Sequence, residues 1–350
     1  MKYRKFGSLD WEASILGLGT ARLPDDTRAS VKLIRAAIDR GVNYLDFGYL
    51  YDTQRQKRVA DIVSEALAGG RRDSVKVAVT LPTGIIRSRK DLRFHLLRQL
   101  KLLRADRADF CLFGRLNRDS WPVLKALGAL EWAERAIEEG KIHQVGFSFH
   151  DHYAVLKTVV ESWDQWSFGQ FQFSYMDIHH DPGITGVKYA ARNGLAVVIT
   201  EPLKGGRLSG DALRFVWNYR EVTTAIRDLS SMAELTASAA MAARARPDSL
   251  TVEEEVQFGR ARDAFLVLRP LPCTSCRGCM PCPEAIDVPR IFELYNDAFM
   301  YGDPQMAQRI YIQEHHRADL CTECGLCEKT CAKRLPVLEW LKKARRLFHP

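Results

Sequence analysis

The sequence predicts an α/β protein in which a (β/α)8 TIM barrel is followed by a small α-helical domain rich in cysteine. Two observations support this prediction. Short apolar, strand-like runs recur through the first 226 residues, with centres about 25 to 35 residues apart, the length of a strand, a loop and a helix. Beyond them, eight of the nine cysteines lie in the last quarter of the 350-residue chain, in two runs of four.

The eight apolar runs are the expected barrel strands. Helical patterns lie between them, such as Val31, Ile34 and Ile38, which Gly41 closes. Eight strand and helix units are the number in a (β/α)8 barrel. A doubly wound open sheet is the alternative, but the Gly-x-Gly-x-x-Gly fingerprint is missing after the first strand. Strands are expected at residues 14–19, 43–47, 75–79, 109–113, 145–149, 168–173, 195–199 and 222–226.

A domain boundary is expected after the last barrel helix. That helix is predicted at Ser231–Arg244, where serines stand at the N-cap position. Farther on, two prolines in Arg269–Pro272 interrupt the helical pattern. We therefore expect a barrel domain at residues 1–268 and a second domain at residues 269–350. In the second domain, helices are expected at Ile291–Met300, which Pro289 starts, and at Val337–Phe348.

Composition limits the class of protein. Hydrophobic residues make up 46% of the chain, the formal net charge is +8 and the pI is about 9.0. Lys and Arg are scattered, without the aromatic-interleaved basic stripe of single-strand binders, so no nucleic-acid partner is expected. An acidic redox partner or a phosphorylated cofactor would suit the positive charge. No apolar run is long enough to span a membrane, so we expect a cytoplasmic protein without a membrane partner.

The eight clustered cysteines predict a metal centre. Thiolates with two residues between them on a tight loop can reach one centre together. The runs resemble those of bacterial ferredoxins, which hold [4Fe–4S] clusters. Zinc is an alternative, but it usually needs only two such pairs. Disulfides are a weaker alternative, because Cys111 is the one cysteine in the remainder of the chain. The predicted iron ligands are Cys273, Cys276, Cys279, Cys282, Cys321, Cys324, Cys327 and Cys331.

The division of these ligands follows from the ferredoxin resemblance. In two-cluster ferredoxins the fourth cysteine of each run binds the other cluster. Two departures occur here: two residues instead of three precede Cys282, and Ala332 replaces a usual proline. We expect two [4Fe–4S] clusters, and at least one. The resemblance implies one cluster on Cys273, Cys276, Cys279 and Cys331, and another on Cys321, Cys324, Cys327 and Cys282.

Motifs along the chain resemble one enzyme family. They are Gly17–Thr20, Gly41–Tyr51, Gly140–His150, Glu201–Gly206 and the cysteine-rich tail. Together they resemble the branch of the aldo-keto reductases that carries a C-terminal [4Fe–4S] domain, over nearly the whole chain. The resemblance implies a (β/α)8 barrel with its active site at the C-terminal ends of the strands.

The family's catalytic set is incomplete here. Its reductases use a tyrosine as proton donor, a lysine paired with an aspartate, and a histidine that orients the carbonyl. Asp46 and Tyr51 match the aspartate and tyrosine, whereas Thr80 replaces the lysine and Gly114 the histidine. Without the lysine, the charge of Asp46 should raise the pKa of Tyr51, which weakens ordinary carbonyl reduction. Alternatively, Asp46 caps a loop and Tyr51 is a packed ring.

The resemblance also implies NADP(H) as a candidate cofactor. Ser148 and Gln170 match residues that hold the nicotinamide carboxamide, and Glu201–Gly206 matches the pyrophosphate loop. Arg227 could pair with a 2′-phosphate, which the neighbouring Asp228 would oppose. The predicted cofactor contacts are Ser148, Gln170, Glu201, Leu203, Lys204, Gly205 and Arg227.

Three functional hypotheses follow. The first is an oxidoreductase that relays single electrons between the clusters and a site at the barrel mouth, with a ferredoxin or flavoprotein as redox partner. It rests on the retention of eight thiolates in a chain that has lost the lysine and the histidine. The second is a non-catalytic electron-transfer or scaffold subunit, and the third an NADP-dependent carbonyl reductase with structural clusters. The sequence leaves a carbonyl, an unsaturated ring and a bound flavin open as substrates.

Overall fold

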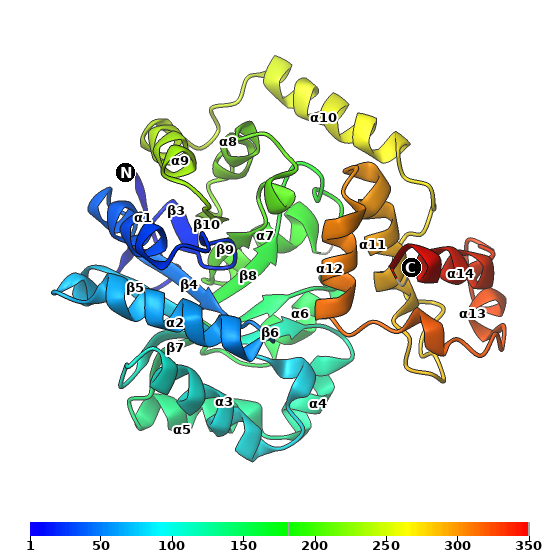
Figure 1. Ribbon diagram of the computed structural model, residues 1–350, viewed down its shortest axis with the longest axis horizontal. Helices are drawn as coiled ribbons and strands as arrows, with labels where there is room; N and C mark the ends of the chain where they lie inside the picture. Colours follow the sequence, from blue (N-terminus) through cyan, green and yellow to red (C-terminus); the bar gives the residue numbers. More distant parts are fainter. Residues whose placement is uncertain (181, 349–350) are drawn as a thin grey trace. The chain divides into compact units, whose positions relative to one another are not determined.

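The computed structural model describes residues 1–180 and 182–348 (Figure 1). The chain divides into two compact units, Met1–Val252 and Glu253–Pro350. Helix α10 (Val252–Val267) therefore groups almost entirely with the second unit. The domain boundary expected from the sequence comes after this helix, at residue 268, and stays a prediction.

The first unit is a closed barrel of eight parallel strands, in the order β10-β3-β4-β5-β6-β7-β8-β9. Each strand overlaps one predicted apolar run, so the (β/α)8 prediction is confirmed. Strands with helices on their outer side are buried, which explains why they appear in the sequence as continuous apolar runs. The strands are β3 (Leu16–Gly19), β4 (Tyr44–Gly48), β5 (Lys76–Leu81), β6 (Ala108–Leu116), β7 (Ile142–Phe149), β8 (Phe168–Gln172), β9 (Ala196–Thr200) and β10 (Val222–Asp228).

Amphipathic helices surround the strands of this unit (Figure 1). The α9 helix begins as predicted, because the Ser231 hydroxyl accepts a hydrogen bond from the backbone N–H of Glu234 at 3.2 Å. The barrel helices are α1 (Thr27–Asp39), α2 (Thr53–Leu67), α3 (Arg89–Leu102), α4 (Ser120–Ala126), α5 (Ala129–Glu138), α6 (Tyr153–Glu161), α7 (Gly183–Arg192), α8 (Asp211–Trp217) and α9 (Met232–Arg244).

A hairpin that the sequence analysis missed closes the N-terminal end of the barrel. It pairs β1 (Tyr3–Lys5) with β2 (Glu12–Ser14) in antiparallel fashion. Phe6 in its turn is fully buried, with ring centroids 4.7 Å from Phe110 and 5.6 Å from Phe168. Because these residues lie near the starts of their strands, the opposite end is the one left for ligands.

The second unit has its own core. Helices α11 and α14 match the predicted helices, whereas α12 was missed. Tyr311 and Phe348 are fully or almost fully buried and stack at 4.7 Å, and the cysteine loops pack against the same cluster of apolar side chains. The helices after α10 are α11 (Val288–Met300), α12 (Pro304–Gln313), α13 (Leu326–Lys329) and α14 (Val337–Phe348).

Candidate functional site

Three of the predicted site residues meet inside the barrel mouth. Ser148 on β7 and Gln170 on β8 are register partners. The amide of Gln170 donates a hydrogen bond to the Asp46 carboxylate at 3.4 Å. Since β4 and β8 lie on opposite sides of the barrel, this contact crosses its interior. The Ser148 hydroxyl accepts the backbone N–H of Arg115 at 2.6 Å.

Asp46 is a largely buried carboxyl that titrates near neutrality. Burial raises the pKa of Asp46 to about 6, although the Gly48 N–H, at 2.9 Å, and the Gln170 amide favour the charged form. A carboxyl in this range can both take up and release a proton near neutral pH. Asp46 could therefore exchange protons with a ligand at the barrel mouth.

Thr80 and Gly114, which replace the lysine and the histidine, pack against each other. A Cβ on Gly114 would lie 2.8 Å from the Leu81 carbonyl oxygen and 2.8 Å from the Thr80 methyl group. The Thr83 hydroxyl also donates a hydrogen bond to the Gly114 carbonyl. A histidine at position 114 would thus collide with β5. The close packing of β5 and β6 therefore favours glycine at this position.

Tyr51 lies on the loop between β4 and α2. Its side chain is 39% exposed, and its ring packs edge to face on Tyr49 at a centroid distance of 5.2 Å. The phenol is accessible to a ligand that enters from solvent, in contrast to the largely buried Asp46.

The residues predicted for the pyrophosphate loop form a small hollow. Glu201, Leu203, Gly205 and Arg227 line it, together with Arg22 and others. Its volume is about 30 Å³, comparable to the share of one water molecule in the liquid. The hollow is therefore too small to enclose a dinucleotide.

Lys204 differs from the other loop residues. It forms an ion pair with Asp177, a residue that was not among the predicted contacts, and the two side chains are 11% and 7% exposed. Asp177 also accepts a hydrogen bond from the Ser174 hydroxyl at 2.7 Å. The ammonium group is thus committed to a buried carboxylate in this conformation.

At the end of β10, charged groups compensate one another. Arg227 donates a hydrogen bond to the Ser238 hydroxyl and lies 3.8 Å from the Glu234 carboxylate. Burial and the nearby Glu201 raise the pKa of Asp228 to about 7. Asp228 is therefore partly neutral at pH 7, so it opposes an incoming phosphate less than its sequence position implied.

The cysteines of the two runs lie near one another. All nine are free in the described chain. Cys279 and Cys282 of the first run line one small pocket together with the first three cysteines of the second run, Cys321, Cys324 and Cys327. Burial raises the pKa of Cys273, and the nearness of Cys276 and Cys331 raises it further, so Cys331 lies beside the first run.

The two cysteine runs share one backbone geometry. The second residue after the first cysteine of each run, Ser275 or Glu323, has a positive φ of 53° or 56°. Two residues later, Arg277 and Gly325 have φ of 59° and 73°. Left-handed backbone is uncommon outside glycine, so its recurrence at equivalent positions indicates two similarly folded loops. The Ser275 N–H also points to the Cys273 sulfur, at 3.4 Å.

These thiols suit clusters. Among the residues that the structure describes, no group of three or more His, Cys, Asp or Glu side chains is arranged around a single metal ion. An iron–sulfur cubane makes a different demand, because each thiolate binds a different iron atom and the four sulfurs need not converge on one point. Two sets of four free thiols on tightly turned loops meet that demand.

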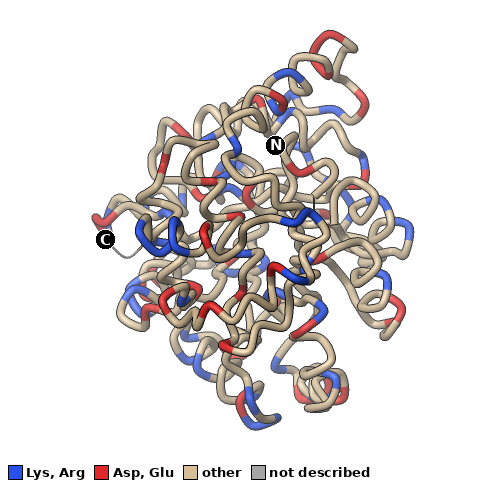
Figure 2. The backbone as a smooth tube through the Cα atoms, turned by 90° about the vertical axis from the view of Figure 1, so that its right-hand side faces the viewer, with Lys and Arg blue, Asp and Glu red and all other residues tan. Residues whose placement is uncertain are grey.

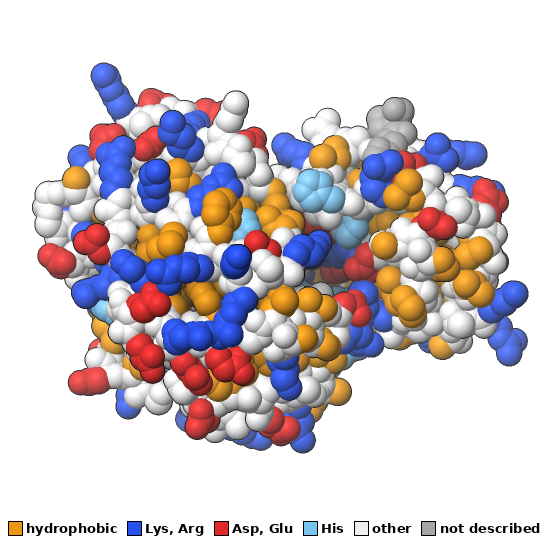
Figure 3. All heavy atoms as spheres, turned by 90° about the horizontal axis from the view of Figure 1, so that it is seen from below, with side chains coloured by type: hydrophobic (Ala, Val, Ile, Leu, Met, Phe, Trp, Pro, Cys, Tyr) orange, Lys and Arg blue, Asp and Glu red, His pale blue; other side chains and the backbone are white. Residues whose placement is uncertain are grey.

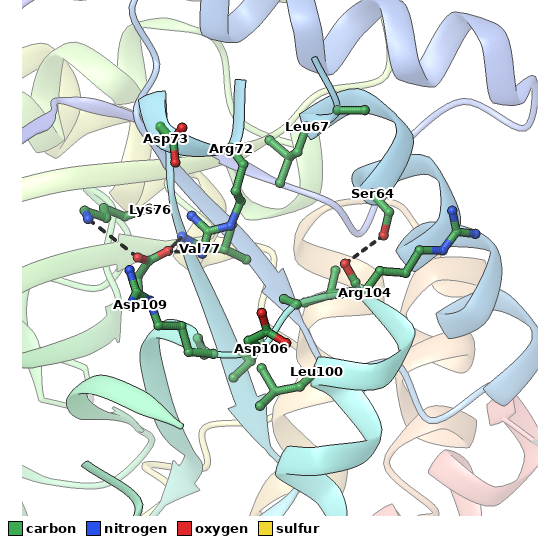
Figure 4. A pocket seen from close by; sticks show the side chains of 16 residues that line it. Ser64, Leu67, Arg72, Asp73, Lys76, Val77, Leu100, Arg104, Asp106 and Asp109 are labelled. Atoms are coloured by element: carbon green, nitrogen blue, oxygen red, sulfur yellow. Dashed lines mark hydrogen bonds and ion pairs between the residues drawn. The ribbon is translucent and has the colours of Figure 1, made fainter. Parts of the chain in front are cut away.

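A larger hollow lies elsewhere, at the N-terminal ends of β5 and β6 (Figure 4). It measures about 630 Å³ and is bordered by α2 and α3. Its buried carboxylate, Asp109, accepts hydrogen bonds from Arg72 at 2.7 Å and the Val77 N–H at 2.8 Å, and Lys76 lies 3.6 Å away. These polar groups form hydrogen bonds and ion pairs with one another. They lie at the N-terminal end of the barrel, where residues usually contribute to stability and not to catalysis.

On the face drawn in Figure 3, basic side chains are interspersed with acidic ones over the barrel. No helix in the described ranges is both long enough and apolar enough to cross a membrane.

Two family models match the sequence. The aldo/keto reductase family matches residues 15–215, and a 4Fe-4S dicluster domain matches residues 272–336. The chain belongs to the aldo/keto reductase family. It is an aldo-keto reductase-type oxidoreductase with a C-terminal 4Fe-4S domain, as the sequence motifs predicted.

Several known proteins are similar to parts of this aldo-keto reductase. An uncharacterised oxidoreductase of Bacillus subtilis, YqkF, is 35% identical over 75 residues, 21% of this chain and 24% of that protein. A second one, YrpG, is 24% identical over 233 residues, 61% of this chain and 70% of that protein. An aldo-keto reductase from Klebsiella pneumoniae, solved with NADPH, superposes with a TM-score of 0.61 at 19% identity, covering 74% of this chain and 94% of its own. The last match shows the fold.

Proposed function

We propose that this aldo-keto reductase relays single electrons between two [4Fe–4S] clusters and a substrate site at the mouth of its barrel. One observation carries the proposal: Cys279 and Cys282 share a pocket with three cysteines that follow them by some forty residues. The two runs therefore meet, which is what an exchange of fourth ligands between two clusters requires. The two proposed ligand sets are Cys273, Cys276, Cys279 and Cys331, and Cys282, Cys321, Cys324 and Cys327.

The barrel mouth supports NADP(H) as the second redox group. The Gln170 side-chain oxygen is buried without a hydrogen-bond partner in the described structure. A nicotinamide carboxamide offers the N–H group that this acceptor lacks, and Ser148 is its register partner. The Klebsiella relative was solved with NADPH. Glu201, Leu203, Lys204, Gly205 and Arg227 would then hold the phosphates and the adenosine.

The roles of the protein groups follow from their positions. Bound clusters would supply single electrons and bound NADP(H) a hydride. Asp46, with a pKa of about 6, would take up or release the proton that accompanies reduction. Tyr51, exposed at the rim, would contact the substrate. The packing of Thr80 against Gly114 argues against the family's lysine and histidine route to carbonyl reduction. A carbonyl, an unsaturated ring and a bound flavin stay open as substrates.

Anaerobic purification tests this proposal. We expect about eight iron atoms and eight sulfides per chain, the content of two [4Fe–4S] clusters, and a visible absorption that dithionite bleaches. Bleaching by NADPH as well would support a relay that includes the barrel. Bleaching by dithionite alone would favour an electron-transfer subunit instead. Colourless, iron-free protein would contradict the proposal.

A further inference from the structure

Large apolar side chains are exposed beside the second cysteine run. Leu320, immediately before Cys321, is 45% exposed, and Leu326, between Cys324 and Cys327, is 48% exposed. Cys324 itself is exposed. Exposed apolar side chains grouped around a functional element mark a contact surface more often than scattered ones do.

Unpaired basic side chains follow directly after these leucines. Lys329, Lys333 and Arg334 are exposed, and none of them forms an ion pair within the described ranges. Lys329 ends α13, and Arg334 donates its backbone N–H to the Cys331 carbonyl at 2.9 Å, so both are tied to the cysteine loop. Basic positions also gather on the last helix, next to the C-terminus (Figure 2).

The acidic side chains of the same loop are engaged within this unit. Glu323 pairs with Lys342 at 2.8 Å. Glu328 accepts the backbone N–H of Leu338 at 2.9 Å. The loop therefore presents positive charge beside apolar side chains, and its carboxylates are held by partners of their own.

We propose that Leu320, Leu326, Lys329, Lys333 and Arg334, termed the carrier surface, dock an acidic one-electron carrier protein. The inference rests on the proposed electron relay, because it names where electrons enter or leave. Complementary charge accelerates encounter between proteins, and transient redox complexes bury small interfaces. Exposed leucines and cations on the loop that carries an exposed cluster ligand suit such a complex, since an electron carrier must approach a cluster closely.

A structural role for the same cations is the competing explanation. They could simply offset the negative charge that thiolates and cluster carry. In that case their removal would shift the reduction potential of the cluster and leave the affinity for a protein carrier unchanged. The two explanations therefore predict different measurements.

The test neutralises the surface in the cluster-loaded protein. The variant is Lys329→Gln, Lys333→Gln and Arg334→Gln combined. Its control removes the same charge from barrel helices through Lys32→Gln, Lys90→Gln and Lys101→Gln, all at exposed positions. The probe is an acidic plant-type [2Fe–2S] ferredoxin, with Kd measured by calorimetry from low to high salt and electron transfer measured by stopped flow.

We expect the surface variant to weaken ferredoxin binding about tenfold at low salt and to flatten its salt dependence. The control should bind like the wild type, and reduction by methyl viologen radical, which needs no docking, should stay within about twofold in both. Leu326→Gln should weaken binding at low and high salt alike, because its contribution is apolar.

Wild-type affinity in the surface variant, equal losses in the control, or no ferredoxin binding by the wild type would each overturn the carrier surface. So would a changed cluster potential with unchanged Kd. The electron relay fails separately, if loaded wild-type protein shows no spectral response to dithionite. Iron content, measured for every variant, verifies that the clusters are intact.

Discussion

At the scale of single residues, Asp46 shows what the loss of a lysine does. The carboxyl has kept its place at the barrel mouth, but its stabilising contacts are now the Gly48 N–H and the Gln170 amide. Two neutral donors compensate burial less well than an ammonium group does, so the pKa rises instead of falling. The residue has changed from a fixed charge into a group that can exchange protons.

Replacing Asp46 by Asn should therefore stabilise the protein at high pH. The native pKa of about 6 exceeds the ordinary value of 3.8, so the native state binds more protons than the unfolded state between these values. Wild-type stability then falls as pH rises from 3.8 to about 6 and stays at the lower value above that pH. Asp46→Asn removes this loss, and we expect a gain of about 3 kcal/mol at pH 8, about twice the gain at pH 5.

Thermal unfolding under anaerobic conditions at both pH values measures this difference. Asp25→Asn, which removes a fully exposed carboxylate, is the control and should change neither value by more than about 0.5 kcal/mol. A variant at position 46 that is destabilised equally at both pH values would show that the charged form is favoured in the fold.

Gly114 is a second residue where packing decides the chemistry. Gly114→Ala should destabilise the barrel by about 1–3 kcal/mol, because the new Cβ would lie 2.8 Å from both the Leu81 oxygen and the Thr80 methyl group. The control is Gly259→Ala on α10, where no atom lies within 4 Å of an added Cβ. Helix propensity makes that change neutral or stabilising. Equal unfolding midpoints for the two variants would mean that β5 shifts to accommodate the new methyl group at little cost in free energy.

At the scale of elements, the sequence predicted what is periodic and missed what is long-range. The eight strands are continuous apolar runs, and α14 is amphipathic, so both are visible locally. The β1–β2 hairpin has strands of three residues each, and its burial depends on Phe6 reaching residues more than a hundred positions away. The Lys204–Asp177 pair, 27 residues apart, was invisible for the same reason.

The hairpin can be tested through its one buried ring. Phe6→Ala should cost about 3–5 kcal/mol, since it opens a cavity among Tyr44, Phe110 and Phe168 at the end of the barrel. Phe94→Ala on α3 is a matched control with a side chain 61% exposed, and it should cost less than about 0.5 kcal/mol. Urea unfolding followed by tryptophan fluorescence compares the two. Similar losses would show that the hairpin does not plug the barrel.

At the scale of the whole molecule, the proposed crossing of ligands makes the two cysteine runs one unit. If each cluster takes its fourth thiolate from the distant run, neither run can hold a complete cluster alone. The clusters then link the two ends of the segment that lies between the runs. Helices α11 and α12, which lie in this segment, pack into the core that the cysteine loops share, so cluster assembly and folding of this core should depend on each other.

Pairs of cysteine substitutions separate crossed from uncrossed ligands. With crossed ligands, Cys282→Ala combined with Cys324→Ala damages one cluster, so about half of the iron should remain. Cys282→Ala combined with Cys276→Ala then damages both clusters, and almost no iron should remain. Uncrossed ligands reverse these two results, because Cys276 and Cys282 would serve the same cluster. Cys111→Ala, which removes a buried thiol from β6, should leave the iron content unchanged. The iron counts of the two double variants, read against this control, therefore decide which sulfur completes which cluster.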